Sequence, residues 1–181
     1  MQQTVSKDFK KHAKLADSAV QFYDKNKIKE AQKPALKLLS GKWDYLFHFY
    51  QVGVAALNAA DNTTAHKMFD YALSLNETSQ VRHSAILKAK GLSYANAHQF
   101  EKAIDTYTAS IQKNPEDDQA YNNRALAYWQ LSQWDIALKD FQKARALNPS
   151  DENTFNNLVR SLIQRGLLAE ATKLLKENEI L

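Results

Sequence analysis

The side chains of this sequence that could do chemistry are five histidines, an acidic run and several asparagines. No two histidines stand four residues apart, so the chain lacks the usual helical zinc motif. Because there is no cysteine, disulfides, thiolate metal sites and a cysteine nucleophile are excluded. The four glycines form neither a phosphate-binding loop nor a Gly-x-Ser-x-Gly motif. The sequence therefore predicts no catalytic residue, no metal site and no cofactor.

The acidic run Glu116-Asp117-Asp118 is the nearest approach to a carboxylate pair or a cation site. It follows Pro115 directly and precedes an apolar pattern of helical spacing. Carboxylates are favourable at the start of a helix, where they accept hydrogen bonds from free backbone N–H groups. We therefore predict that this run caps a helix.

Two asparagine pairs, Asn122-Asn123 and Asn156-Asn157, stand 34 residues apart. An asparagine amide offers two donors and one acceptor oxygen, so a row of amides can bind the backbone of an extended peptide. Asparagine is a mediocre helix former, and such pairs inside predicted helices favour a function. The alternative is that these amides are solvated or cap helices.

The elements that must position these side chains are helices. The chain has 181 residues, of which only four are glycine and three proline, too few for the frequent turns of a β-sandwich. Apolar residues make up 44%, which argues against disorder, and the mean hydropathy of −0.55 argues against membrane spans. The N-terminus lacks the apolar stretch of a signal peptide, so a cytoplasmic location is the expectation.

An internal repeat of about 34 residues organises the chain. Asn114-Pro115 and Asn148-Pro149 are 34 residues apart, and small and bulky residues recur in the same phase. The small column is Ala31, Ala65, Ala103, Ala137 and Ala171, and bulky residues follow four positions later at Phe69, Tyr107, Phe141 and Leu175. Two upstream columns are Leu15, Phe49, Leu87, Tyr121, Phe155 and Ala19, Gly53, Gly91, Ala125. Small residues let antiparallel helices approach closely, so each unit is predicted to be a helical hairpin.

This pattern resembles the tetratricopeptide repeat (TPR) family. The resemblance rests on Gly91, Tyr94, Ala103, Tyr107 and Pro115 in one unit, and on Tyr121, Ala125, Tyr128, Ala137, Phe141, Ala144 and Pro149 in the next. It implies an all-α, right-handed TPR-like superhelical solenoid of about ten helices, in one domain over 1–181. We place repeats at 46–79, 84–117 and 118–151, a C-terminal repeat and capping helix at 152–181, and a degenerate repeat or cap at 12–45.

Departures from the pattern give further predictions. Four extra residues around 80–83 predict a longer first helix, capped near Thr78 or Ser79. Pro34 falls inside an expected helix, which should either begin near Lys33 or be kinked there. Trp134 is predicted to lie in the core with Phe100, whereas Trp129 is either a groove anchor or packing between repeats.

The resemblance implies a concave face built from the first helix of each unit, and hence a protein-binding groove. In this view the chain is a non-catalytic scaffold that binds an extended peptide or a helix of another protein, with no nucleic acid involved. The predicted peptide-binding residues are Tyr50, Gln51, Val54, Lys88, Leu92, Asn96, Asn122, Asn123, Trp129, Asn153, Asn156, Asn157 and Arg160.

The chain is a poor match for the TPR receptors that clamp the carboxylate tail of a chaperone. Their Lys, Asn, Asn, Lys and Arg correspond here to Lys88, Leu92, Asn123, Asn153 and Asn157, of which two agree. Two of the three cations needed for the carboxylate are missing. We therefore do not expect a tail receptor.

The alternative function is a small secretion-type TPR chaperone. Val5, Phe9, His12, Ala16 and Val20 form an amphipathic stripe that could dimerise such a protein. The expected state is accordingly a monomer or a weak homodimer.

The charge is concentrated at the N-terminus. Residues 1–45 hold ten lysines and five acids, a net charge of +5, whereas residues 46–181 carry −1. With no arginine and few aromatic residues in this segment, solvated lysines on a helix face are the expected interpretation.

Overall fold

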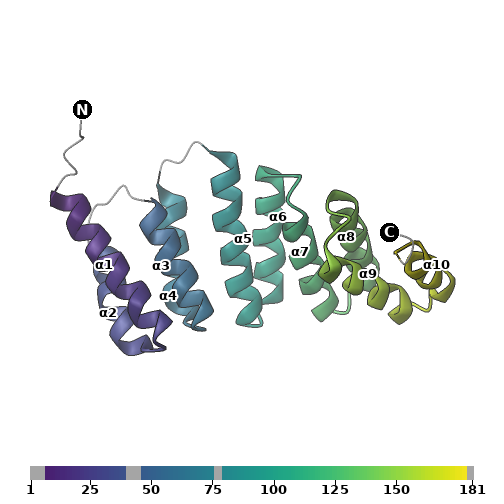
Figure 1. The fold of residues 1–181 in the computed structure, drawn as a ribbon, viewed down its shortest axis with the longest axis horizontal. Coiled ribbons are helices and arrows are strands. Elements are labelled where there is room, and N and C mark those ends of the chain that lie inside the picture. Colours follow the sequence, from purple (N-terminus) through teal and green to yellow (C-terminus); the bar gives the residue numbers. More distant parts are fainter. Residues whose placement is uncertain (1–6, 40–45, 76–78, 179–181) are drawn as a thin grey trace.

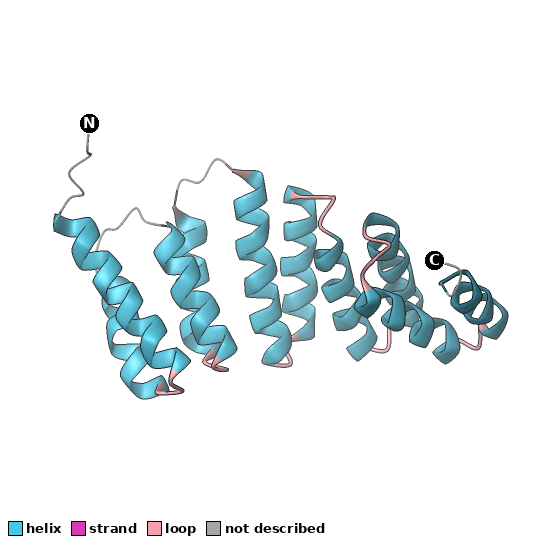
Figure 2. Ribbon diagram, in the orientation of Figure 1, coloured by secondary structure: helices cyan, strands magenta, loops and turns pink. Residues whose placement is uncertain are grey.

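A computed structural model describes residues 7–39, 46–75 and 79–178, and in this part of the chain it has ten helices and no strand (Figures 1 and 2). The helices are α1 (Lys7–Asp24), α2 (Ile28–Leu39), α3 (Leu46–Asn58), α4 (Asn62–Ser74), α5 (Gln80–Asn96), α6 (Phe100–Lys113), α7 (Asp118–Gln130), α8 (Trp134–Leu147), α9 (Glu152–Gln164) and α10 (Leu168–Asn178). Consecutive helices pair as α1–α2, α3–α4, α5–α6, α7–α8 and α9–α10, and the pairs stack in a row (Figure 1). The predicted all-helical TPR-like solenoid is confirmed.

The first helices of the pairs form one side of the stack. Successive first helices contact one another from α1 to α7, whereas among the second helices only α2 and α4 do so to a similar extent. In a curved stack, the elements on the inner side lie closer together. The first helices therefore provide the inner wall, as expected from the resemblance.

The small column of the repeat lies at the centre of the hairpins. Ala31, Ala65, Ala103, Ala137 and Ala171 are all buried, as are Phe69, Tyr107 and Phe141 four residues later. Leu175 at the corresponding place in α10 is 41% exposed, because among the described residues α9 is the one helix that α10 contacts extensively. For that position the expected core packing is wrong.

Two glycines permit the closest approach between paired helices. A Cβ atom at Gly53 would stand 2.6 Å from the Phe69 ring, and one at Gly91 would stand 2.6 Å from the Tyr107 ring. Carbon atoms in ordinary contact are about 3.5–4.0 Å apart, so no larger side chain fits without displacing the ring. These positions explain why the upstream small column contains glycine in the second and third hairpins.

The helix starts follow the predicted capping. Asp117 accepts a hydrogen bond from the Ala120 N–H at 3.1 Å, so the acidic run caps α7. The Ser79 side chain accepts one from the Arg82 N–H and caps the 17-residue helix α5, as predicted. Thr78, the other predicted cap, lies outside the described residues.

Pro34 lies inside α2, which begins at Ile28, and the expectation that this helix starts near Lys33 is wrong. A proline removes one backbone hydrogen bond of the helix. The residues around it on the buried face, Ala31, Ala35 and Leu38, are fully enclosed in the core. Their burial offsets the lost bond, since the burial of several apolar side chains together contributes more than one hydrogen bond does.

Trp134 is only partly buried, so its predicted place in the core is wrong. Its ring meets the edge of Trp129, with the ring centroids 4.7 Å apart and the planes at 79°. Trp134 is the first residue of α8, and at the end of the hairpin fewer neighbours surround a side chain.

Candidate functional site

The inner wall carries a hollow of about 530 Å³ between α5 and α7. Leu92 from α5 and Leu126 from α7 face it, and they are 40% and 38% exposed, which is high for leucine. Phe100 of α6 contributes aromatic surface, Tyr107 borders the hollow although only 1% of it is exposed, and amides come to the same hollow from Asn96, Asn123 and Gln130. Of the predicted binding residues, this hollow brings together Leu92, Asn96 and Asn123.

A second hollow, of about 320 Å³, lies between α1 and α3. It contains the predicted residues Tyr50, Gln51 and Val54 together with Phe47, which is 64% exposed. An exposed phenylalanine beside an apolar valine and an amide suits contact with a partner side chain. The predicted residues therefore form two separate groups along the stack.

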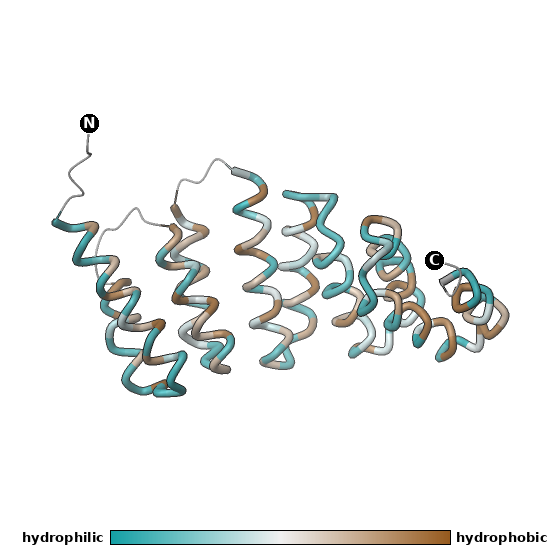
Figure 3. The backbone as a smooth tube through the Cα atoms, in the orientation of Figure 1, coloured by the Kyte–Doolittle hydropathy of each residue, from teal (hydrophilic) through white to brown (hydrophobic). Residues whose placement is uncertain are grey.

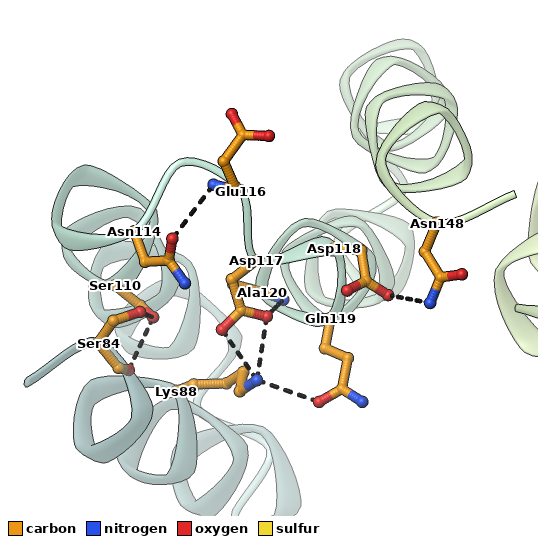
Figure 4. A network of polar contacts seen from close by, with 10 residues as sticks. All are labelled: Ser84, Lys88, Ser110, Asn114, Glu116, Asp117, Asp118, Gln119, Ala120 and Asn148. Carbon is orange, nitrogen blue, oxygen red and sulfur yellow. Dashed lines mark hydrogen bonds and ion pairs between the residues drawn. The ribbon is translucent and has the colours of Figure 1, made fainter. Parts of the chain in front are cut away.

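The charge of Lys88 is not free to bind a ligand. Its Nζ forms an ion pair with Asp117 at 2.9 Å and donates a hydrogen bond to Gln119 at 3.0 Å, both at the start of α7 (Figure 4). In the same network Asn148 donates to Asp118 at 3.1 Å. These contacts join α5 to α7 and α7 to the end of α8. Lys88 is thus a link between repeats, and its charge is already compensated.

The two asparagine pairs also contact each other. The Asn157 amide donates to the Asn122 side-chain oxygen at 3.1 Å, from α9 to α7. Each of these amides keeps further hydrogen-bonding capacity, but one bond of each is used between repeats. Asn123, beside the hollow, is the member of the pairs whose position best suits a ligand.

The remaining predicted residues lie away from both hollows. Asn153, Asn156 and Arg160 are exposed along α9. Trp129 is partly buried, packs on the core of the last two hairpins and meets Trp134. Of the two roles considered for Trp129, the structure supports packing between repeats.

Several residues of the larger hollow were not predicted. His98 and Phe100 come from the α5–α6 turn and the start of α6, and Ala60 and Asn62 from the preceding hairpin. His98 has a left-handed backbone, with φ of 56°, and its ring lies edge-on to Phe100. The equivalent turns hold Asn26, Ala60, Ser132 and Gly166, all at positive φ. This recurrence at one place in each turn is a signal that could have located His98.

Polar contacts fix how neighbouring hairpins meet. The Asp61 carboxylate accepts hydrogen bonds from Tyr23 at 2.8 Å and Gln32 at 2.9 Å, and it also caps α4 through Thr64. Burial raises the pKa of Asp61, but these hydrogen bonds together outweigh burial and hold the pKa below its ordinary value. Farther along, Arg124 of α7 donates a hydrogen bond to Thr108 of the preceding hairpin at 3.1 Å, while a two-pronged ion pair with Asp140 of its own hairpin, at 2.7 and 2.8 Å, holds its side chain in place.

The stripe expected to dimerise a chaperone is used inside the molecule. His12 and Ala16 are buried, and the Phe9 ring lies 5.3 Å from that of His48 in α3. Val20 packs on the same core, and Val5 lies outside the described residues. The stripe faces α3 because that helix continues the stack, so in this fold it does not form the free dimerisation surface that was expected.

Two further features of the described residues concern membranes and metal ions. None of the described helices is long and apolar enough to cross a membrane. Among the same described residues, no three histidine, aspartate or glutamate side chains are grouped so as to hold a metal ion.

Known proteins share the repeats of this chain. The tetratricopeptide repeat family model matches residues 119–151, and a TPR repeat model matches residues 91–132. The photosystem I assembly protein Ycf3 of Synechococcus sp. (strain CC9605) is 32% identical over 80 residues, 44% of this chain and 46% of that protein. Ycf3 of Prochlorococcus marinus (strain NATL2A) is 31% identical over 80 residues, again 44% of this chain and 46% of that protein. This chain thus spans about half the length of the curated relatives it matches.

Solved structures share the fold over most of the chain. MamA from Desulfovibrio magneticus RS-1, from residue 41 to its end, superimposes with a TM-score of 0.72 at 23% identity and covers 92% of both chains. A chain of the Cut9–Hcn1 hetero-tetramer of the APC/C gives a TM-score of 0.67 at 19% identity, covering 83% of this chain and 30% of that one. At these identities the likeness concerns the fold alone. Together with the stacked helical hairpins, the matches show that this chain contains tetratricopeptide repeats within residues 91–151 and folds as a TPR-like helical solenoid.

Proposed function

We propose that this protein is a non-catalytic scaffold that binds an extended segment of a partner protein along the inner wall of its solenoid. The observation that carries the proposal is the hollow between α5 and α7, where Leu92 and Leu126 are exposed beside amides. Exposed leucines grouped in a concave surface are a frequent mark of a protein-binding site.

The composition of the hollow suits a peptide in extended conformation. An apolar side chain of the peptide would enter between Leu92 and Leu126, which removes apolar surface from water. Asn96, Asn123 and Gln130 would then hydrogen-bond the peptide backbone, because amides supply both donors and acceptors. The second hollow, with Tyr50 and Val54, would take another part of the same segment.

The comparisons support a role with protein partners. The TPR family is matched in the third and fourth hairpins, which provide most of the larger hollow. The curated relatives are named for the assembly of photosystem I, and an assembly protein must contact other proteins. The partner, the cytoplasmic location and the expected monomer or weak homodimer remain predictions for this chain.

The test is selection of peptides from a displayed random library on the intact chain, followed by titration of the selected peptides. Leu92→Glu with Leu126→Glu should abolish binding, since both side chains are already exposed and their replacement spares the core. Asn96→Ala with Asn123→Ala should weaken binding about 25-fold, at about 1 kcal/mol for each lost hydrogen bond.

Gln142→Ala is the matched control, because this amide is exposed on α8, the second helix of its hairpin, and lies outside both hollows. It should leave affinity unchanged. Selected peptides that bind the leucine variant as well as the original chain would refute the inner-wall site.

The secretion-type chaperone is a weaker candidate, because the stripe expected to mediate its dimer packs against α3. Sedimentation of the chain before and after deletion of residues 1–24 distinguishes the two proposals. An obligate dimer lost on deletion would restore the chaperone proposal.

A further inference from the structure

Another apolar groove lies at the opposite end of the molecule from α10, on the first hairpin. It has a volume of about 540 Å³ and lies between α1 and α2. Leu15, Phe22 and Pro34 form its apolar part, and Lys29, Lys33 and Lys37 line the side made by α2. We call these six residues the N-terminal groove.

The repeat shows what such a position normally holds. Leu15 belongs to the same column as Phe49 and Phe155, which are 0% and 7% exposed. Phe49 is covered from the preceding hairpin by His12, with ring centroids 5.1 Å apart, and Phe155 by Arg145 of α8. In the second and fifth hairpins, therefore, a helix of the preceding repeat covers this column, whereas Leu87 and Tyr121 in the third and fourth hairpins are partly buried.

For the first hairpin no preceding helix exists among the described residues. Leu15 and Phe22 are only partly buried and line the groove, although they also contact the core. The N-terminal groove thus has the place in the repeat that a neighbouring helix covers in the second and fifth hairpins. A helix with an apolar face is the shape that fits it.

The charge around the groove defines the polar side of such a helix. Over residues 7–39 the first hairpin carries nine lysines and four acids, and Figure 3 shows hydrophilic residues along much of α1 and α2. Lys29, Lys33 and Lys37 recur every four residues along α2, and Lys11 stands one turn before Leu15 on α1. Neither Lys29 nor Lys33 forms an ion pair within the described residues, and Glu30 is the one acidic residue of the groove lining.

We infer that the N-terminal groove binds an amphipathic, acidic helix of a partner protein. Its apolar side chains pack on Leu15, Phe22 and Pro34, and its carboxylates face Lys29 and Lys33. No residue of this groove lines either hollow of the inner wall, so the inference does not depend on the peptide proposed to bind there.

Other occupants fit the groove less well. Duplex DNA is held through its phosphates and has no use for a recessed apolar pocket. A membrane surface is bound by apolar side chains that protrude into the lipid, whereas here they lie inside a hollow. A second copy of this chain would offer α10, whose Glu170, Lys173, Lys176 and Glu177 balance in charge and do not complement the lysines.

The test uses the full chain and a panel of fluorescent helical peptides about four turns long. Each peptide has Leu or Phe at positions i, i+4 and i+7 and glutamates flanking them, and a matched panel has lysines in place of the glutamates. Binding is followed by fluorescence anisotropy at about 50 and about 200 mM salt. The acidic peptides should bind, with affinity falling as salt rises, and the lysine panel should not bind.

The variants locate the contact. Lys29→Glu with Lys33→Glu should weaken binding of the acidic peptides by about 10-fold or more, since each replacement turns an attraction into a repulsion. Lys139→Glu with Lys143→Glu is the matched control, because these exposed lysines of α8 have the same spacing and change the net charge equally. It should change affinity less than twofold, and circular dichroism should show the same helix content for all variants.

Four results would overturn the inference. The first is that no acidic peptide binds, and the second is that the Lys29/Lys33 and Lys139/Lys143 variants lose affinity for the acidic peptides equally. The third is that a short DNA duplex or phosphatidylserine vesicles bind more tightly than the peptides and that Lys29→Glu with Lys33→Glu abolishes this binding. The fourth is self-association of the chain that Lys29→Glu with Lys33→Glu abolishes. The second result would mean that the lysines act only through net charge, the third that they bind a polyanion, and the fourth that they bind a second copy of the chain.

Discussion

Replacing Gly91 by alanine tests the close packing that defines the third hairpin and the wall of the larger hollow. The new Cβ would stand 2.6 Å from Cε1 and 2.7 Å from Cδ1 of Tyr107. An ordinary contact needs about 3.5 Å, so the ring or α5 must shift by about 0.9 Å. Tyr107 is 1% exposed, so its ring is enclosed by neighbours that must move with it.

Two effects of opposite sign set the magnitude. Overpacking of a filled core costs about 1–3 kcal/mol. Alanine is the better helix former by about 1 kcal/mol, which offsets part of this cost. We expect a net loss in the free energy of unfolding of up to about 2 kcal/mol, or a fall in Tm of up to about 8 °C for a chain of this length.

The assay is urea unfolding followed by circular dichroism, in a double-mutant cycle with Tyr107→Leu. The smaller leucine makes room for the new methyl group, so in that background Gly91→Ala should be neutral or stabilising by up to about 1 kcal/mol. Gly53→Ala against Phe69 should repeat the result in the second hairpin, where the corresponding distance is also 2.6 Å. If Gly91→Ala alone raised the unfolding midpoint, the close approach of α5 and Tyr107 would be refuted.

Three further predictions concern the links between repeats and the turns. Asp61→Ala removes a helix cap and the acceptor for Tyr23, and calorimetry should show a loss of about 2–4 kcal/mol; an unchanged Tm would refute this role. Burial, with a smaller contribution from the charge of His48, lowers the pKa of His12 to about 4. As the pH falls, His12 therefore takes up a proton in the unfolded chain before it does so in the folded one. Urea unfolding at several pH values should show the free energy of unfolding falling as the pH drops from about 6.5 to about 4, and His12→Leu should reduce this fall. Ser132→Gly removes the strain of a left-handed serine with φ of 59°, so urea unfolding should show stability unchanged or raised by up to about 1 kcal/mol, whereas Ser132→Val should lower it.

Prediction from the sequence succeeds best at the repeat columns. Ala65, Ala103 and Ala137 recur with the repeat, and their burial follows because a helical hairpin must place its small residues where the two helices meet. The long helix α5 and its cap at Ser79 follow from the four additional residues in the same way. These are local or periodic properties, and the sequence contains them directly.

The sequence predicted less about which inner-wall residues face a ligand. Leu92, Asn96 and Asn123 meet at one hollow, while Tyr50 and Val54 belong to another. Lys88 is compensated by Asp117, which lies 29 residues away, and Asn157 contacts Asn122 across two hairpins. Such pairings depend on the rotation of one hairpin against the next, which the periodicity of a single repeat does not contain.

The sequence by itself thus determined the class of fold, the helical hairpins, their small-residue seams and the absence from this chain of cysteine chemistry. Only the tertiary structure decided that Pro34 stays inside a helix, that the stripe through His12 packs on α3, and that α1 and α2 form a lysine-lined groove. The physical reason is that helix formation follows short-range spacing, whereas exposure depends on which helices from distant parts of the chain pack against each side chain.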